Sequence, residues 1–300
     1  MQIKNNNANN LQNRWIIGSI KWVLLVGCLY FIITRFQDQS INLNEIEWPN
    51  SIGLTLGFVF FLMILNWYLE ALRWKVSLQS FDPISIKRAW NVILSGLALN
   101  WILPFTSGDL IARIFQQRDK YQTSSAAMLN RGIMLGFTLI LGFYGVSHLA
   151  IDTTWDGLLS VIIIAGIGIT LFVFRKSLSG FLQYFQELSS ASFIKITILS
   201  LMRYVVFVVQ FYLLLVVFMP EAEPTLLIAG IGWIFLIRSA LPLFFGGVGV
   251  REASGILFFE PHIADLQLVL IPVFLIWIIN TVIPSLVGLI FVWRTKLFFR

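Results

Sequence analysis

The sequence has little charge for its length. Charged residues make up 12% of its 300 residues, whereas 58% are hydrophobic and the mean hydropathy is +0.83. Soluble globular domains carry about 25% charged residues, so roughly half of the usual solvating charge is missing. This scarcity excludes the soluble fold classes and predicts an all-α polytopic membrane protein.

The sequence is also poor in residues that bind metals or form disulfides. Cys28 is its single cysteine, which excludes an internal disulfide, and the two histidines, His148 and His262, stand far apart. Structural and catalytic metal sites need several such ligands, so we expect no metal. No motif indicates a cofactor, and a phosphate-cradling nucleotide loop is missing, which argues against ATP as an energy source.

Long apolar runs dominate what is present. A membrane-spanning helix needs about 20 apolar residues, and the runs that approach or exceed this length are Trp15–Thr34, Ile52–Leu69, Gly132–Ala150, Gly157–Phe174, Ile196–Met219 and Gln267–Trp293. The first run lacks a small-residue cleavage site and is typical of an anchor rather than a signal peptide. We expect residues 1–14, which are rich in asparagine, to form a disordered cytoplasmic tail and residues 15–300 a single membrane domain.

Basic and acidic residues are sorted between the loops. Most of the 21 lysines and arginines fall in segments on one side of the predicted spans. The opposite side carries Arg35 and a set of acids: Asp38, Glu45, Glu47, Asp152, Asp156, Glu221, Glu223, Glu260 and Asp265. Because lysine and arginine concentrate in cytoplasmic loops, we expect a multi-pass protein of the plasma (inner) membrane with both termini cytoplasmic. The basic excess is then a signal of topology, and we expect no nucleic-acid partner.

Two apolar segments do not fit simple spans. Asn91–Leu103 is thirteen residues long with basic residues on both sides, which predicts a hairpin that enters from the cytoplasm and turns at Pro104. Thr225–Phe259 is interrupted by Arg238 and Pro242 and has acidic residues on both sides, which predicts a hairpin that enters from outside. Whether the second hairpin is re-entrant or two short spans stays open.

The two predicted hairpins share a sequence pattern. The first reads LPFTSGDLIAR and the second LPLFFGGVGVRE, and in both the proline precedes a glycine by four residues and an arginine by nine. Each half of the sequence runs span, span, hairpin, span, and an odd number of full spans inverts the second half. We therefore predict six to eight transmembrane helices in two inverted-topology halves, at about 15–150 and 157–293.

Residues around the hairpins are the candidate ligand-binding residues. Half-helices that begin inside the membrane offer free N–H groups and a positive dipole end to an anion, and arginine suits phosphate or carboxylate. We expect Thr106 or Ser107 to cap the second half-helix of the first hairpin. The candidates are Asn100, Gly108, Asp109, Arg113, Arg238, Gly246, Gly247, Gly249, Arg251 and Glu252, with Glu70, Arg73 and Arg203 as secondary candidates.

Purely structural roles for the charged candidates stay open. Arg113 and Asp109 can form an ion pair that holds the first hairpin, and the arginine of the second hairpin can pair with its neighbouring acid. Glu70 and Arg73 have the spacing of an ordinary interfacial pair on one helix face. Arg203 can extend to the membrane surface from the end of its helix.

Three of these segments resemble a known family. NWYLEALRWK, LPFTSGDLIAR and LPLFFGGVGVREA resemble the transmembrane domain of the lysylphosphatidylglycerol synthase/flippase family, also described as flippase-like, and the resemblance runs from about Trp15 to Trp293. It implies translocation or handling of a lipid with a phosphate-bearing head group, such as an anionic phospholipid or a polyprenyl phosphate. In two-domain members a soluble aminoacyl-transfer domain follows, whereas this sequence ends at Arg300, so the resemblance gives no basis for aminoacyl transfer.

Three functions are compatible with these residues. The leading prediction is a flippase-like carrier, which is not an enzyme. The first alternative is a non-transporting accessory subunit that binds lipid beside a separately encoded partner enzyme. The second is a membrane-embedded enzyme acting on a lipid head group, which needs a nucleophile or base, and the acids near the hairpins are Glu70, Asp109 and Glu252. The sequence does not predict an oligomeric state.

Overall fold

The computed structural model describes residues 48–101, 107–149, 184–241, 247–263 and 265–295, together with Tyr30 and Thr34. In these residues the regular structure consists of helices, as the composition predicts. The predictions for the tail of residues 1–14, for the span Gly157–Phe174 and for most of Trp15–Thr34 lie outside the described residues. So do Pro104, Thr106, Pro242 and Gly246 at the two predicted turns.

Four helical segments of the described chain are long and apolar enough to span a membrane, and they confirm four of the predicted spans. They are α2 (Ile52–Ser77), α5 (Lys120–Val146), α8 (Ser190–Phe218) and the segment Gln267–Trp293. The last is built from α11 (Gln267–Trp277), a π-helical turn η5 (Ile278–Val282) and α12 (Ile283–Thr295). An integral multi-pass membrane protein follows from these lengths.

Two of these helices are longer than the sequence predicts. α2 continues eight residues beyond Leu69, and α5 begins twelve residues before Gly132. Both extensions contain polar residues, which made them resemble loops, but several of these side chains are buried in the protein, among them Arg73 and Asn130. A helix can therefore continue through them, because their polar groups have partners inside the fold.

The last segment contains an irregularity. Pro272 lies inside α11 and Pro284 lies near the start of α12, with η5 between them. Proline has no N–H to donate and crowds the preceding turn, and a π-helical turn is one way in which a helix absorbs such a defect.

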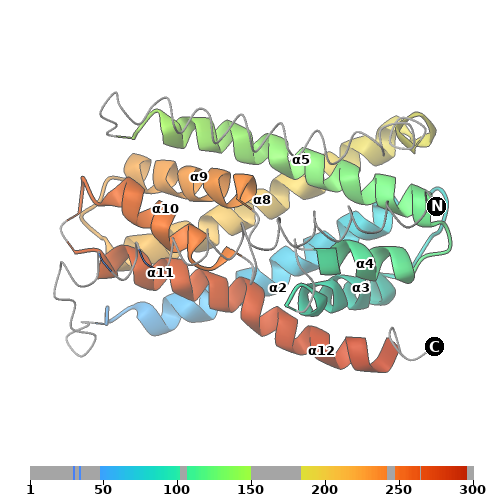
Figure 1. The fold of residues 1–300 in the computed structure, drawn as a ribbon, viewed down its shortest axis with the longest axis horizontal. Helices are drawn as coiled ribbons and strands as arrows, with labels where there is room; N and C mark the ends of the chain where they lie inside the picture. Colours follow the sequence, from blue (N-terminus) through green and yellow to red (C-terminus); the bar gives the residue numbers. More distant parts are fainter. Residues whose placement is uncertain are drawn as a thin grey trace, which may run out of the picture.

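Four shorter helices form two pairs. α3 (Ile86–Leu99) packs against α4 (Ser107–Phe115), and α9 (Pro224–Ala240) packs against α10 (Val250–Phe259). The second arms have 9 and 10 residues, about 14 and 15 Å at 1.5 Å per residue, which is half of a 30 Å hydrocarbon core. The α3–α4 pair starts and ends at the right-hand end of the bundle, and the α9–α10 pair at the left-hand end (Figure 1).

Helices from the two halves of the chain pack against one another. α2 packs against α8, α5 against α9, and α12 against α3. A Cβ added at Gly145 in α5 would lie 2.5 Å from the Ala229 carbonyl oxygen in α9, and one added at Gly288 in α12 would lie 2.0 Å from the Leu94 carbonyl oxygen in α3. In both contacts a glycine on a long helix lets two backbones touch.

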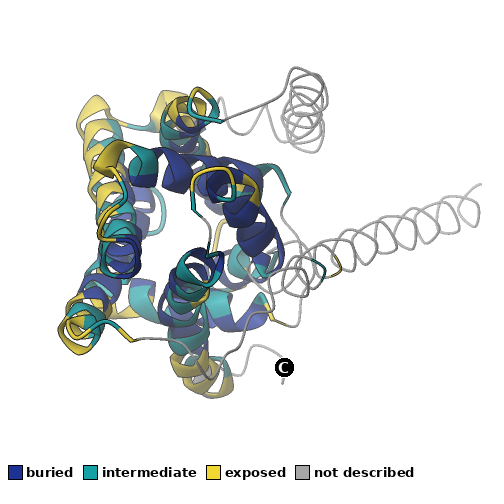
Figure 2. Ribbon diagram, turned by 90° about the vertical axis from the view of Figure 1, so that its left-hand side faces the viewer, coloured by how far each residue is buried: buried dark blue, intermediate teal, exposed yellow. Residues whose placement is uncertain are grey.

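Buried residues face the centre of the bundle and exposed ones cover its outer faces (Figure 2). One apolar cluster joins α8, α9, α10 and α11 to the first part of α2, which includes Val59 and Met63. A second joins α3 and α5 to the last part of α2, which includes Ala71 and Trp74. Polar side chains of α2 lie between these two clusters along the helix.

The two ends of the bundle differ in charge. At the end where α2 stops and α3, α5 and α8 begin (right in Figure 1) lie Lys75, Lys87, Arg88, Arg118, Lys120 and Lys195. Two acids at this end have local roles: Asp82 accepts from the Arg118 N–H at 3.0 Å, and Asp119 caps α5. The opposite end carries Glu221, Glu223, Glu260 and Asp265. This distribution matches the predicted sidedness of the loops.

Candidate functional site

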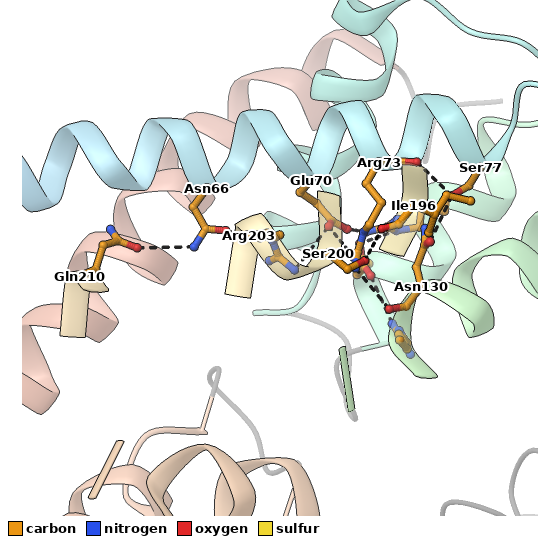
Figure 3. Close-up of polar contacts among 12 residues, drawn as sticks. Asn66, Glu70, Arg73, Ser77, Asn130, Ile196, Ser200, Arg203 and Gln210 are labelled. Carbon is orange, nitrogen blue, oxygen red and sulfur yellow. Dashed lines mark hydrogen bonds and ion pairs between the residues drawn. The ribbon is translucent and has the colours of Figure 1, made fainter. Parts of the chain in front are cut away.

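A stripe of buried polar residues runs along α2. Asn66, Glu70, Arg73 and Ser77 are spaced by four, three and four residues, which places them on one face of the helix. Each is at most 3% exposed. Figure 3 shows the stripe facing side chains of α5 and α8, so this face of α2 binds other helices rather than lipid.

Glu70 lies at the centre of this cluster. Its Oε2 atom is 2.5 Å from Arg73 Nη2 on the same helix, and its Oε1 atom is 2.6 Å from Arg113 Nη2 on α4. Arg203 Nη1 on α8 lies 3.4 Å from the same Oε2 atom as Arg73. One carboxylate therefore joins three arginines from three helices, in a site where burial strengthens each ion pair.

A second carboxylate extends the cluster. Asp109 Oδ1 lies 2.8 Å from Arg113 Nε, one turn away on α4, and Asp109 Oδ2 lies 3.3 Å from Arg131 Nη2 on α5. The Arg113 guanidinium also lies over the Trp74 ring, 4.4 Å from its centroid. The ion pair of Arg113 with Asp109, one of the structural roles left open by the sequence, is therefore present, but Arg113 divides its donors between two carboxylates.

Neutral groups accept hydrogen bonds from the second terminal nitrogen of Arg73. Its Nη1 atom donates to Ser200 Oγ at 3.0 Å and to the Asn130 carbonyl at 3.3 Å. Ser77 Oγ donates to Asn130 Oδ1 at 3.1 Å, and the Tyr184 hydroxyl donates to the Ser77 carbonyl at 2.8 Å. These bonds fix α5 and α8 against the end of α2.

The other end of the stripe reaches the crossing of α2 and α8. Arg203 Nε donates to Asn66 Oδ1 at 2.9 Å, and its guanidinium lies 5.1 Å from the centroid of Trp67. Asn66 Nδ2 approaches Gln210 Oε1 at 3.5 Å, and Gln210 Nε2 donates to the Val59 carbonyl at 2.9 Å. Arg203 is therefore held within the protein.

This geometry corrects two structural interpretations that the sequence left open. Glu70 and Arg73 are 2% and 3% exposed, and Glu70 contacts two further arginines, so they are not an ordinary interfacial pair. The side chain of Arg203 is 18% exposed and bound to Asn66 and Glu70, so it does not simply extend to the surface. All three secondary candidates belong to one cluster with Arg113.

The cluster carries more positive than negative charge. Four arginines contact two carboxylates: Arg73, Arg113, Arg131 and Arg203 against Glu70 and Asp109. The Arg131 side chain is 39% exposed, so the buried part of the cluster has an excess of one positive charge. Buried charge is costly unless paired. An arrangement that leaves guanidinium charge in excess at this depth is suited to an added anion.

Asn100 and Gly108 have structural roles in the first hairpin. Asn100 Oδ1 accepts from the Asp109 N–H at 3.1 Å, so Asn100 satisfies a free donor at the start of α4. A Cβ at Gly108 would lie 2.4 Å from the backbone nitrogen of Asn100, and one at Gly96 would lie 2.8 Å from the Cα of Asp109. The hairpin closes because two glycines let α3 and α4 touch.

Glycine and a carboxylate shape the second hairpin. Gly247 and Gly249 have φ angles of 87° and 84°, a region that favours glycine. The Gly249 N–H donates to Glu252 Oε2 at 2.7 Å, which closes the first turn of α10. Glu252 is thus a capping residue, and Gly246, the remaining glycine candidate, lies outside the described residues.

Two arginines lie beside this turn. Arg251 is 2% exposed, and Arg238 is half-buried with its Cγ 3.2 Å from the position of a Cβ on Gly247. Arg238 is close enough to both Arg251 and Arg203 for their like charges to repel. The second hairpin therefore brings its two arginines toward the Arg203 side of the first cluster.

Sequence reasoning missed the neutral members of the cluster, which are Asn66, Ser77, Asn130, Ser200 and Gln210. The available signal was periodicity: polar residues at helical spacing in an apolar run mark a buried polar face of a membrane helix. Ser200, Arg203 and Gln210 on α8 have this spacing as well.

Comparison with known proteins identifies no relative. No protein-family model matches the chain, and neither a curated protein nor a solved structure matches it.

Proposed function

We propose that this chain is a flippase-like membrane protein that binds a lipid through an anionic, phosphate-bearing head group and moves that lipid across the bilayer. The observation that carries the proposal is the excess of guanidinium charge around Glu70 and Asp109, with Arg238 of the second pair near Arg203. Phosphate is the head-group chemistry that arginine forks and free backbone N–H groups bind best.

The composition of the helices supports a bound ligand as the source of negative charge for these arginines. Of the 15 aspartates and glutamates in the sequence, Glu70, Asp109 and Glu252 lie within the described long helices and helix pairs. Two of these already serve the first cluster, and Glu252 Oε2 caps α10. An arginine at the centre of a membrane helix costs about 2.5–3.5 kcal/mol on insertion scales, so a lipid phosphate that joins Arg238 and Arg251 is favoured electrostatically.

The packing of the helices supports an inverted repeat. In such a repeat α2 corresponds to α8, α3 to α9, α4 to α10, and α5 to α11–η5–α12. The main helix contacts follow this correspondence: α5–α9 matches α12–α3, α3–α4 matches α9–α10, and α2–α8 matches itself. The two short pairs also start from opposite ends of the bundle (Figure 1). In transporters built this way the substrate binds at the interface of the repeats, near broken helices, which is where the arginines gather.

The proposal assigns different roles to the two arginine groups. Arg238 and Arg251, with the N–H groups at the start of α10, hold the phosphate, because Gly247 and Gly249 add no side chain to a turn that Arg238 approaches closely. Arg113 and its two carboxylates hold the opposite wall rigid. The long helices confine the head group between them while its tails stay in the bilayer.

Transport is tested with purified protein in lipid vesicles. Fluorescent phosphatidylglycerol is placed in both leaflets, and the fraction that a membrane-impermeant quencher reaches is followed with time. We expect Arg238→Ala and Arg251→Ala to lower the translocation rate at least about tenfold, the effect of losing one charge-assisted contact. Arg118→Ala, an exposed arginine outside the cluster, is the matched control. Unchanged rates in both hairpin variants refute the proposal, and saturable binding without translocation indicates a lipid-binding accessory protein instead.

Opposite insertion of the helix pairs is tested by labelling. Single cysteines replace exposed Ser85 before α3 or exposed Thr225 near the start of α9, in a background in which Cys28 is changed to serine. In sealed inside-out vesicles we expect an impermeant maleimide to label the first site and not the second, and right-side-out vesicles to give the reverse. Labelling of both from one face contradicts the inverted arrangement.

A further inference from the structure

α3 has two different faces, each against another element. On one face, Gly96 and Asn100 contact Asp109 of α4, which belongs to the charged cluster. On another face, Leu94 and Ala98 contact Gly288 of α12. The width of one helix, about 10 Å, therefore separates the polar cluster from the α3–α12 contact.

An apolar groove of about 190 Å³ lies on the α12 side of α3. It is lined by Ala98, Trp101, Val282, Ser285, Leu286 and Leu289. Ser285 presents no free hydroxyl to it, because its Oγ donates to the Thr281 carbonyl at 2.6 Å. Leu286 and Leu289 are 59% and 46% exposed, so the groove opens on the outer face of a helix that is long enough to span the membrane.

Trp101 lines this groove, and a second tryptophan lies against it. Trp101 follows α3 directly at the turn of the first pair, and its ring centroid is 6.0 Å from that of Trp277 at the end of α11. Tryptophan is enriched at membrane interfaces, yet these two lie toward the middle of the bundle, where flat aromatic surface can pack against a hydrocarbon chain. Asn100, the neighbour of Trp101, reaches Asp109, so the groove begins where the charged cluster ends.

We propose that the α3–α12 groove binds one hydrocarbon chain of the lipid whose head group binds the arginine cluster, an inference that rests on the proposed function. The outer face of a spanning segment meets acyl chains, and the groove presents only apolar atoms and a satisfied serine to them. Its tryptophan end lies next to Asn100, whose side chain accepts from the Asp109 N–H in the charged cluster. The substrate class is then a lipid held at both its phosphate and its chain, and α3 separates the two contacts.

The test uses photoactivatable phosphatidylglycerol with a diazirine near one chain end, in phosphatidylcholine nanodiscs that contain the purified protein. Cross-links are mapped by mass spectrometry. We expect cross-links at Trp101, Leu286 or Leu289 that unlabelled phosphatidylglycerol competes away, and uncompeted labelling at Ile140, an exposed α5 residue that reports bulk lipid. Leu289→Trp fills the groove and lowers the competed labelling about tenfold, the effect of displacing roughly two methylenes.

The matched control is Ile290→Trp, which adds the same ring to the next residue, 54% exposed and outside the groove. Competed labelling that survives Leu289→Trp, or groove labelling that unlabelled lipid does not reduce, overturns the proposal. So does a disulfide between two copies of Leu289→Cys that blocks labelling, because a second protein copy then fills the groove. Arg238→Ala separates the two proposals: an unchanged translocation rate in this variant refutes the head-group site, whereas competed groove labelling that persists in it leaves the chain site standing.

Discussion

The arginines of the two helix pairs have different surroundings. In the first pair, α3–α4, Arg113 meets two carboxylates at 2.6 and 2.8 Å and covers the Trp74 ring. In the second pair, α9–α10, Arg238 is close enough to Arg251 for their like charges to repel, and Glu252 Oε2 closes the first turn of its own helix. The same short sequence pattern thus gives an arginine shared by two carboxylates in one pair and two neighbouring arginines in the other.

This difference separates stability from binding. A buried ion network holds helices together, and removing one member leaves the others uncompensated. A buried group of like charges is unfavourable until an anion arrives. We therefore expect substitutions in the first pair to act mainly on folding, and substitutions in the second to act mainly on ligand binding.

The largest effect on folding is expected from Glu70→Gln. It removes the carboxylate shared by Arg73, Arg113 and Arg203 and leaves buried guanidinium groups facing one another. We expect the free energy of unfolding in mixed micelles to fall by about 3–5 kcal/mol. Glu221→Gln, on an exposed acid at the opposite end, is expected to leave it unchanged. A wild-type unfolding curve for Glu70→Gln means that the network does not hold the helices together.

A smaller effect is expected where the first pair closes. Gly108→Ala places a Cβ 2.4 Å from the backbone of Asn100, and we expect a loss of about 3 kcal/mol, at the upper end for overpacking. Gly249→Ala strains a φ of 84° and is expected to cost about 1–2 kcal/mol. Gly132→Ala, with open space around it, is the control for both. If Gly249→Ala is the more harmful change, the first pair is not the more tightly packed one.

Asn100→Ala sharpens the comparison further. It removes the side chain that accepts from the Asp109 N–H at the start of α4, and loss of such a cap costs about 1 kcal/mol. Asn91→Ala, on the same helix, is the control, because the described structure gives the Asn91 side chain no hydrogen bond. Equal unfolding free energies for the two variants show that the Asn100 side chain does not stabilise the turn.

The sequence predicts the spans and the helix pairs better than the polar cluster. Length and hydropathy identify α2, α5, α8 and the last segment, and the basic or acidic flanks identify the pairs, because these features are local. The spacing of Asp109 and Arg113 likewise predicts their ion pair.

The contacts between helices could not be predicted in the same way. Glu70 and Arg73 look like a local pair in the sequence, and their burial follows from Arg113 and Arg203, which come from helices far along the chain. Which face of α8 meets α2 depends on the packing of all the helices at once. The polar stripe on α2 predicts that a partner exists, but its identity requires the fold.

The most direct test of this account compares the stability and the ligand response of Arg238→Ala. Because Arg238 is half-buried and lies near like charges, we expect the unfolding temperature of the lipid-free variant to equal or exceed that of the wild type. Titration with phosphatidylglycerol in neutral detergent is expected to raise the wild-type unfolding temperature saturably, and to do so in the variant only at about tenfold higher lipid concentration. The same lipid dependence in both proteins contradicts the claim that the second pair supplies the charge that binds a lipid phosphate.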